Sequence, residues 1–209
     1  MNKHILIVDD HRIVLKGLVA IVRETLGNDV RIDTACSGSD AVMILKSQRY
    51  DICILDIGLP DMDGVKLLKS MKSLYPAMAV IVHTVHDQIW YMKEFLKYGA
   101  DAIIFKNTDI GEIAEALRNV IQGNSYLCHG AKALKHVAGD HEVLTRREHQ
   151  ILTLLAQGKT SNEIAGILGI TVATVEFHRG HLLEKFSARN VADLIVKAIS
   201  TGYLSLPLD

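Results

Sequence analysis

The chain has 209 residues, of which 49% are hydrophobic and 22% charged, and its formal net charge is -1. This composition fits one or two globular domains and excludes a disordered, collagenous or disulfide-framework protein. No apolar run reaches the roughly 18 residues that a membrane span requires, so we expect a cytoplasmic protein with no membrane partner. Three cysteines without C-x-x-C spacing, Cys36, Cys53 and Cys128, predict reduced thiols.

Residues 1–121 alternate short apolar runs with segments of helical periodicity. The runs rich in Ile and Val predict five strands, at His4 to Val8, Val30 to Ala35, Ile52 to Leu55, Ala79 to His83 and Ala102 to Phe105. Helices are predicted between and after them, at Arg12 to Leu26, Ala41 to Leu45, Val65 to Met71, Ile89 to Leu96 and Ile110 to Ile121. This alternation predicts a flavodoxin-like, doubly wound α/β domain with a five-stranded parallel sheet.

Residues 122–142 predict a linker with room for one short helix, because glycines punctuate a mostly polar stretch. Residues 143–209 predict an all-α second domain of four helices. We place these at Arg146 to Gln157, Asn162 to Leu168, Val172 to Phe186 and Val191 to Ser200. Capping boxes beginning at Thr145 and Thr160 start the first two helices, and Gly158 and Gly169 suit left-handed residues at their ends.

Acidic residues follow two strands of the predicted sheet. In the flavodoxin-like order, the first and third strands are neighbours, and their ends carry Asp9, Asp10 and Asp56. Three carboxylates at one point need a cation, and a hard divalent ion such as Mg²⁺ suits oxygen ligands. With Thr84 and Lys106 from the next two strand ends, these residues form a phosphoryl-transfer set in which Asp56 is the nucleophile.

The same residues carry a family resemblance. The stretches Ile-Leu-Ile-Val-Asp9-Asp10-His11, Leu55-Asp56-Ile-Gly-Leu-Pro60, His83-Thr84 and Gly99-Ala100-Asp101 leading to Lys106 resemble the receiver domain of bacterial two-component response regulators. The resemblance covers residues 1–121. It implies that a sensor histidine kinase phosphorylates Asp56, and that the carbonyl of Gly58 is a further metal ligand.

Two positions depart from the receiver pattern. Receivers usually have Tyr or Phe where this chain has Ile103, and Pro or Asp where it has Asn107. We expect Thr84 to move toward the phosphoryl group while Ile103 repacks only modestly. A dimer interface would then carry most of the signal.

The second domain has a helix-turn-helix pattern, in which the second helix enters the DNA major groove. The apolar positions predict a core of Ile164, Ala165, Leu168, Val172, Val175, Leu182, Leu183 and Phe186. Candidates for the outward face of the second helix are Thr174, Glu176, Phe177, Arg179, Gly180 and Lys185. On periodicity alone, a helical interaction module remains open.

Motifs in this domain resemble the LuxR-type DNA-binding domain. They are Leu144-Thr-Arg-Arg-Glu148, Leu154-Leu-Ala-Gln-Gly158-Lys-Thr-Ser-Asn162-Glu-Ile-Ala165, and Thr174-Val175 followed by His178 and Lys185. A receiver followed by this domain is the arrangement of NarL/FixJ-family response regulators. The resemblance implies binding to promoter DNA through the six candidates above together with Thr160, Ser161, Asn162 and Thr171.

The charge of the second domain is unusual for a DNA-binding protein. Glu176 stands where the LuxR-type family usually has Lys, and Gly180 where it often has a polar or basic residue. Residues 142–209 contain seven Lys and Arg and seven Asp and Glu, so their net charge is zero. We therefore expect weak binding per monomer and dependence on a homodimer that spans two half-sites.

Two other functions fit parts of the sequence. A Mg²⁺-dependent phosphohydrolase also uses an aspartyl phosphate, but it needs an acid/base Asp where this chain has Gly58. It also leaves the helical domain unexplained, so we expect no enzyme. The alternative is a receiver linked to a protein-interaction module with weakened or lost DNA binding, which Glu176, Gly180 and the zero net charge support.

Overall fold

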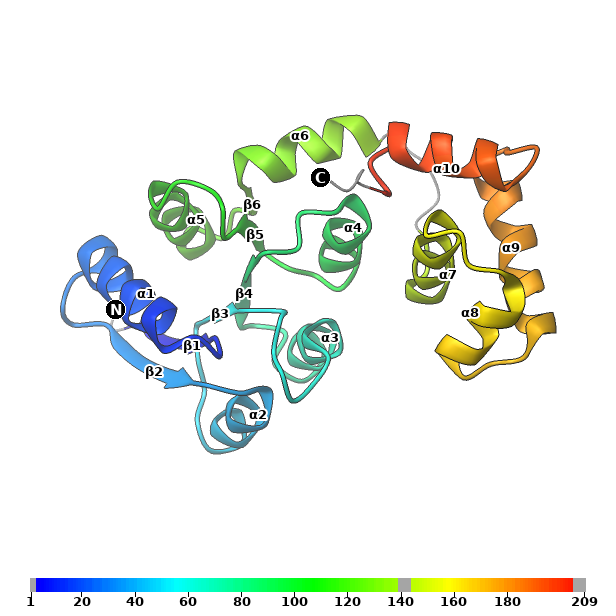
Figure 1. Cartoon of the computed structure of the whole chain (residues 1–209). Coiled ribbons are helices and arrows are strands. Elements are labelled where there is room, and N and C mark those ends of the chain that lie inside the picture. The colour runs from blue at the N-terminus through cyan, green and yellow to red at the C-terminus, as the bar shows by residue number, and fades with distance from the viewer. Residues whose placement is uncertain (1–2, 139–143, 205–209) are drawn as a thin grey trace. The chain divides into compact units, whose positions relative to one another are not determined.

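The structure is a computed structural model that describes residues 3–138 and 144–204. These residues form two compact units, the first made of residues 3–87 and 91–133 and the second of residues 88–90, 134–138 and 144–204. The first unit is an α/β layer structure and the second is helical (Figure 1). In the described part of the chain, no helix is both long enough and apolar enough to span a bilayer.

A parallel sheet with the order β2-β1-β3-β4-β5-β6 forms the centre of the first unit. Its strands are β1 (His4–Val8), β2 (Arg31–Ala35), β3 (Ile52–Leu55), β4 (Ala79–Thr84), β5 (Ala102–Phe105) and β6 (Tyr126–Leu127). The flavodoxin-like order predicted from the sequence is confirmed. All residues of β3 and β5 are buried, as expected for strands covered on both faces.

Five helices cover the two faces of the sheet. They are α1 (Arg12–Leu26), α2 (Gly38–Ser47), α3 (Gly64–Leu74), α4 (Ile89–Lys97) and α5 (Gly111–Ile121). Helices α1 and α5 lie together on one face, and α2, α3 and α4 lie on the other (Figure 1). Leu15, Leu18 and Val22 follow the helical period and bury the inner face of α1.

The sheet has six strands, so the prediction of five was one short. Strand β6 pairs with β5, and α6 (His129–Ala138) follows it within the predicted linker. Two residues are too few to give a strand pattern in the sequence. Tertiary contacts hold them instead, because Tyr126 N donates to Asp101 O and Cys128 N donates to Ile103 O, both at 3.0 Å. The rest of the predicted linker, residues 139–142, lies outside the described residues.

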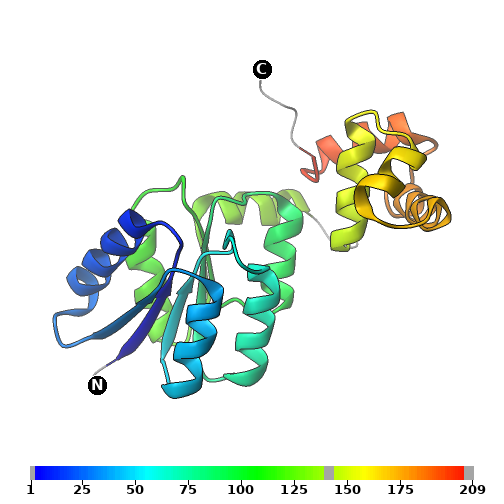
Figure 2. The same ribbon diagram turned by 60° about the horizontal axis from the view of Figure 1, so that its bottom comes forward.

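The helical unit contains the four predicted helices, α7 (Arg146–Ala156), α8 (Ser161–Leu168), α9 (Val172–Lys185) and α10 (Val191–Ser200). Figure 2 shows them from yellow to red, grouped together. Both predicted capping boxes are present, at Thr145 and Thr160. Gly158 and Gly169 have φ angles of 77° and 62°, so the left-handed conformation predicted for the residues after α7 and α8 is confirmed.

Of the eight predicted core residues of the helical unit, four are buried, and Leu168, Leu183 and Phe186 are partly buried. Ile164, Ala165, Val175 and Leu182 are buried. The prediction for Val172 was wrong, since this side chain is 40% exposed. Val172 is the first residue of α9, at the end of the helix, where its side chain is less covered by neighbouring elements. The helical period predicts the face on which a residue lies but not this loss of cover at the helix end.

Candidate functional site

Four side chains meet at the carboxyl ends of β1 and β3. Asp9, Asp10, His11 and Asp56 each offer one possible metal-ligating atom, and these atoms lie within 4.8 Å of one another. Asp9 and Asp56 are buried, whereas Asp10 is partly exposed. The convergence arises because β1 and β3 are parallel neighbours, as the sequence pattern required.

Lys106 neutralises part of this charge. Its Nζ lies 2.7 Å from Asp9 Oδ2 and 2.7 Å from Asp56 Oδ2. Burial works against the Lys106 ammonium, but the two carboxylates outweigh this effect and raise the pKa of Lys106 above its ordinary value. The lysine therefore remains charged beside Asp56, in position to bind an anionic group on that carboxylate.

Thr84 is the last residue of β4 and is fully buried. It lies at the same edge of the sheet, where the carboxyl ends of the parallel strands meet, and this edge is called the rim below. Its Oγ1 accepts a hydrogen bond from His86 N at 3.1 Å. Next to it, burial and then the nearby Lys106 charge lower the pKa of His83 to about 4. At neutral pH His83 is therefore uncharged and adds no positive charge to the acidic cluster.

Two other predicted site residues lie nearby. Gly58 N donates to Asp56 Oδ1 at 3.0 Å, which fixes the orientation of the Asp56 carboxylate. Ile103 is fully buried in β5, paired with Val82 on one side and Leu127 on the other. The added strand β6 thus covers the edge of β5 at the position where receivers usually have an aromatic side chain.

Two further polar residues, one in the acidic cluster and one at the start of α2, were not predicted from the sequence. His11 Nδ1 lies 2.7 Å from Asp10 Oδ1, and His11 N donates to Asp9 Oδ1 at 2.9 Å. Asp61 accepts from Gly38 N at 2.9 Å and Ser39 N at 2.8 Å, which caps the start of α2. The Asp-Asp-His run was a visible signal for His11, whereas the contact of Asp61 is too distant in sequence to show as a pattern.

The candidate DNA-binding residues divide by exposure. The exposed ones are Thr160, Asn162, Thr171, Glu176, Phe177 and Gly180, and the partly buried ones are Ser161, Thr174, Arg179 and Lys185. Thr160 and Thr171 are N-cap residues of α8 and α9, and Thr171 accepts from Thr174 N at 3.1 Å. Phe177 lies one helical turn before His181 on the same side of α9, with ring centroids 4.2 Å apart.

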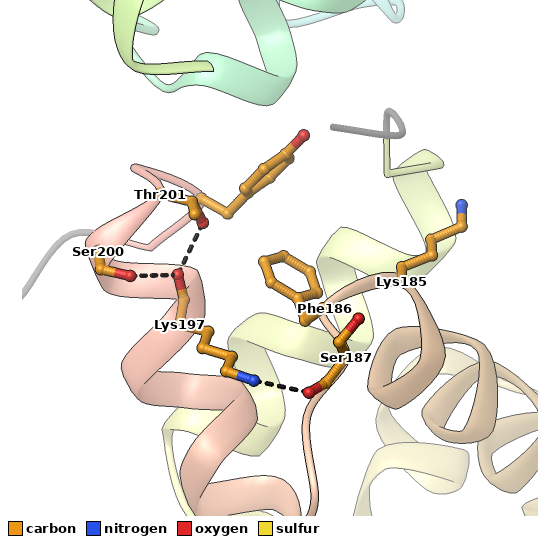
Figure 3. Close-up of a pocket in the computed structure, with 7 residues that line it drawn as sticks. Lys185, Phe186, Ser187, Lys197, Ser200 and Thr201 are labelled. Atoms are coloured by element: carbon orange, nitrogen blue, oxygen red, sulfur yellow. Dashed lines mark hydrogen bonds between the residues drawn. The ribbon is translucent and has the colours of Figure 1, made fainter. Parts of the chain in front are cut away.

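Lys185 does not lie on the exposed face with the other candidates. Its Nζ lies 2.9 Å from Glu148 Oε2, inside the helical unit. Lys197 also bonds within the unit: its Nζ donates to the Ser187 carbonyl at 2.6 Å, and both residues line a cavity of about 300 Å³ at the ends of α9 and α10 (Figure 3). Both lysines therefore stabilise the unit.

Comparison with known proteins gives two family matches. Residues 5–118 match the family described as response regulator receiver domain, and residues 142–198 match that described as bacterial regulatory proteins, luxR family. The chain is 35% identical to the transcriptional regulatory protein UhpA of Salmonella typhimurium, over 90% of this chain and 93% of that protein. It is 31% identical to the transcriptional regulatory protein MctR of Rhizobium johnstonii, over 96% and 95% of the two chains.

Solved structures show a similar fold. RcsB from Salmonella enterica serovar Typhimurium, bound to a promoter in the presence of the phosphomimetic BeF3-, is 22% identical with a TM-score of 0.68. The match covers 96% of this chain and 99% of RcsB.

The fold, the acidic rim and these matches define a response regulator, with a receiver domain followed by a DNA-binding domain of the luxR type. Within that class, the chain belongs to the NarL/FixJ family of transcription regulators. The family resemblance found in the sequence is therefore confirmed.

Proposed function

We propose that a sensor histidine kinase transfers a phosphoryl group to Asp56, and that the phosphorylated chain acts as a homodimer on promoter DNA. The bridge from Lys106 Nζ to Asp56 and Asp9 is the observation that carries the first part. It places a permanent cation at the carboxylate that receives the charge. In the transfer, an Asp56 oxygen attacks phosphorus while the bond to the kinase histidine breaks, and Lys106 stabilises the new negative charge.

The residues at the rim also fit a magnesium ion. Asp9, Asp10 and Asp56 supply carboxylate oxygens within reach of one another, which is the ligand type that Mg²⁺ prefers. The imidazole of His11 suits this ion less well. When bound, Mg²⁺ neutralises charge on the phosphoryl oxygens. Thr84 is placed to bind a phosphoryl oxygen by moving its hydroxyl, and Ile103 follows this movement only slightly.

The test is uptake of a phosphoryl group from a small phosphodonor. We expect Asp56→Asn to abolish uptake, because the amide is no longer a nucleophile, while the unfolding temperature stays near that of the wild type. Asp87→Asn, an exposed aspartate near the same rim, is the matched control and should retain uptake. Chelation of Mg²⁺ should stop uptake by the wild type. Labelling of the Asp56→Asn variant would refute the assignment.

One observation favours a second function for the helical unit, an interaction module without DNA affinity. Its charged side chains are largely paired with each other, as in the contact of Lys185 with Glu148. Titration of the full chain against random-sequence duplex at low salt, with beryllofluoride as phosphoryl mimic, separates the two. No binding at any concentration would favour the interaction module, whereas salt-dependent binding supports the DNA-binding regulator.

A further inference from the structure

Three side chains form a closed cluster on the helix-turn-helix. Ser161 is the first residue of α8, and Glu176 and Arg179 lie one turn apart on α9. Glu176 Oε1 lies 2.5 Å from Ser161 Oγ and 2.6 Å from Arg179 Nη1. Arg179 Nη1 also donates to Ser161 Oγ at 2.7 Å. Because each side chain contacts both others, the cluster fixes all three in one arrangement.

The exposure of the pair shows which member faces outward. The side chain of Glu176 is 52% exposed, whereas that of Arg179 is only 28% exposed, and Arg179 Nε is buried. The arginine therefore lies along the surface of the unit with its charge balanced by the carboxylate. Both hydrogen bonds of Glu176 use Oε1, so among the described residues Oε2 has no hydrogen-bond partner, and the side chain as a whole is half exposed.

The other Lys and Arg side chains of the unit also lie close to acceptors. Each basic side chain whose position is described contacts an acceptor within the unit: Arg147 contacts Leu168 O, Lys159 contacts Glu163, Lys185 contacts Glu148, Arg189 contacts Asp193 and Lys197 contacts Ser187 O. A carboxylate in the middle of the exposed face also repels phosphate. Neighbouring acceptors thus offset part of the positive charge of the unit, although the Arg189 side chain is 89% exposed and can still reach phosphate, and more of the recognition is left to contacts with base edges.

We propose that Glu176 is a specificity-determining residue, which accepts a hydrogen bond from the exocyclic amino group of a cytosine or adenine in the major groove. Those amino groups are the donors that a carboxylate can recognise there. Arg179 and Ser161 are positioning residues that hold the carboxylate in place. This role depends on the proposed function, because it requires that the helical unit bind DNA.

The test is enrichment of bound sequences from a random duplex pool by the full chain, in the presence of beryllofluoride and Mg²⁺. For the wild type, we expect one position in each half-site to be restricted to cytosine or adenine. Glu176→Gln should change the preference at that position alone and weaken binding to the wild-type site about 5- to 150-fold. Arg179→Met should broaden the preference at the same position, because Glu176 loses its main support.

Glu184→Gln is the matched control, since Glu184 is another exposed glutamate of α9 and its replacement removes the same charge. It should leave the enriched sequence unchanged. If Glu176→Gln keeps the wild-type sequence and only raises affinity for every duplex equally, then Glu176 acts as a repulsive charge and the proposal is wrong. If the wild type binds no duplex at all, both the proposed DNA-binding function and the role of Glu176 are wrong. This outcome can be told apart from the previous one, in which the protein binds DNA but Glu176 does not set the sequence preference.

Discussion

The pair formed by Glu148 and Lys185 gives the sharpest stability prediction. Glu148 caps α7 through Thr145 N at 2.7 Å and is almost fully buried, while Lys185 at the end of α9 supplies its counter-charge at 2.9 Å. Burial acts to raise the pKa of Glu148. Lys185 and the contacts with Thr145 outweigh it, so the pKa lies below its usual value. We therefore expect Lys185→Met to destabilise the helical unit at neutral pH.

The size of this destabilisation follows from how little the two side chains are exposed to solvent. The side chains of Glu148 and Lys185 are 4% and 18% exposed, so removing the lysine leaves a buried carboxylate without its partner. Such losses cost about 3–5 kcal/mol. Because water can reach the place of the lysine, we expect the lower value, about 3 kcal/mol. Glu148→Gln combined with Lys185→Met should cost less than Lys185→Met alone, because no unpaired charge remains.

Hydrogen exchange of the amides in α7 and α9 of the full chain measures this cost. A loss of 3 kcal/mol corresponds to roughly 150-fold faster exchange through global opening. The control is Lys197→Met, since Lys197 is 38% exposed and its loss should cost below about 1 kcal/mol. The penalty should be largest at neutral pH and should shrink as the pH falls, because burial without Lys185 raises the pKa of Glu148 and the protonated side chain no longer needs the lysine. Equal exchange in the wild type and Lys185→Met at pH 7 would refute the reasoning.

Three further predictions concern the backbone and one cap. Gly64→Ala should destabilise the receiver by about 1–3 kcal/mol, because a Cβ at this position would lie 2.4 Å from Ile57 O. Urea unfolding measures this loss, and an unchanged unfolding midpoint would contradict the prediction. Gly169→Ala should lower the free energy of unfolding of the helical unit by about 1–2 kcal/mol, because φ at this position is +62°. Gly166→Ala should raise it by about 1 kcal/mol, because Gly166 lies within α8 with open space around it. A serine hydroxyl and two amides lower the pKa of Asp61 to about 2, so its contribution to stability is present above pH 4 and lost toward pH 2. Thermal unfolding of Asp61→Ala should lack that part of the pH dependence, and a profile parallel to the wild type would argue against the cap.

Periodicity and turn chemistry were sufficient for most of the fold. The strands β1, β3 and β5 begin and end where the runs of Ile and Val do, and the capping boxes fixed the starts of α7 and, within one residue, α8. Strand β6 could not be predicted in this way. Its two residues owe their conformation to the neighbouring strand and to the Tyr126 hydroxyl, which lies 2.7 Å from a carboxylate oxygen of Glu112 and of Glu115 and donates its one proton to this pair. Such contacts across the fold leave no local pattern.

The functional sites likewise contain some features that a sequence pattern predicts and others that depend on contacts between distant residues. The convergence of Asp9, Asp10 and Asp56 followed from strand order, because topology alone brings those strand ends together. Whether a cation of α9 faces solvent depends instead on its partners. Lys185 is at a position that helical spacing could assign to the outside, yet an acidic residue 37 positions away in the chain draws it inward.

Strand β6 also has a consequence for how the receiver is isolated. A fragment ending at Ile121 would lose both β6 and the hydrogen bond that the Ile103 carbonyl accepts from Cys128 N. The backbone of β5 would then be an open sheet edge next to a fully apolar strand, which is a template for pairing with another molecule. Self-association of so short a fragment would result from this exposed edge and not from the native dimer interface. Receiver dimerisation is therefore better studied with a fragment that extends through α6.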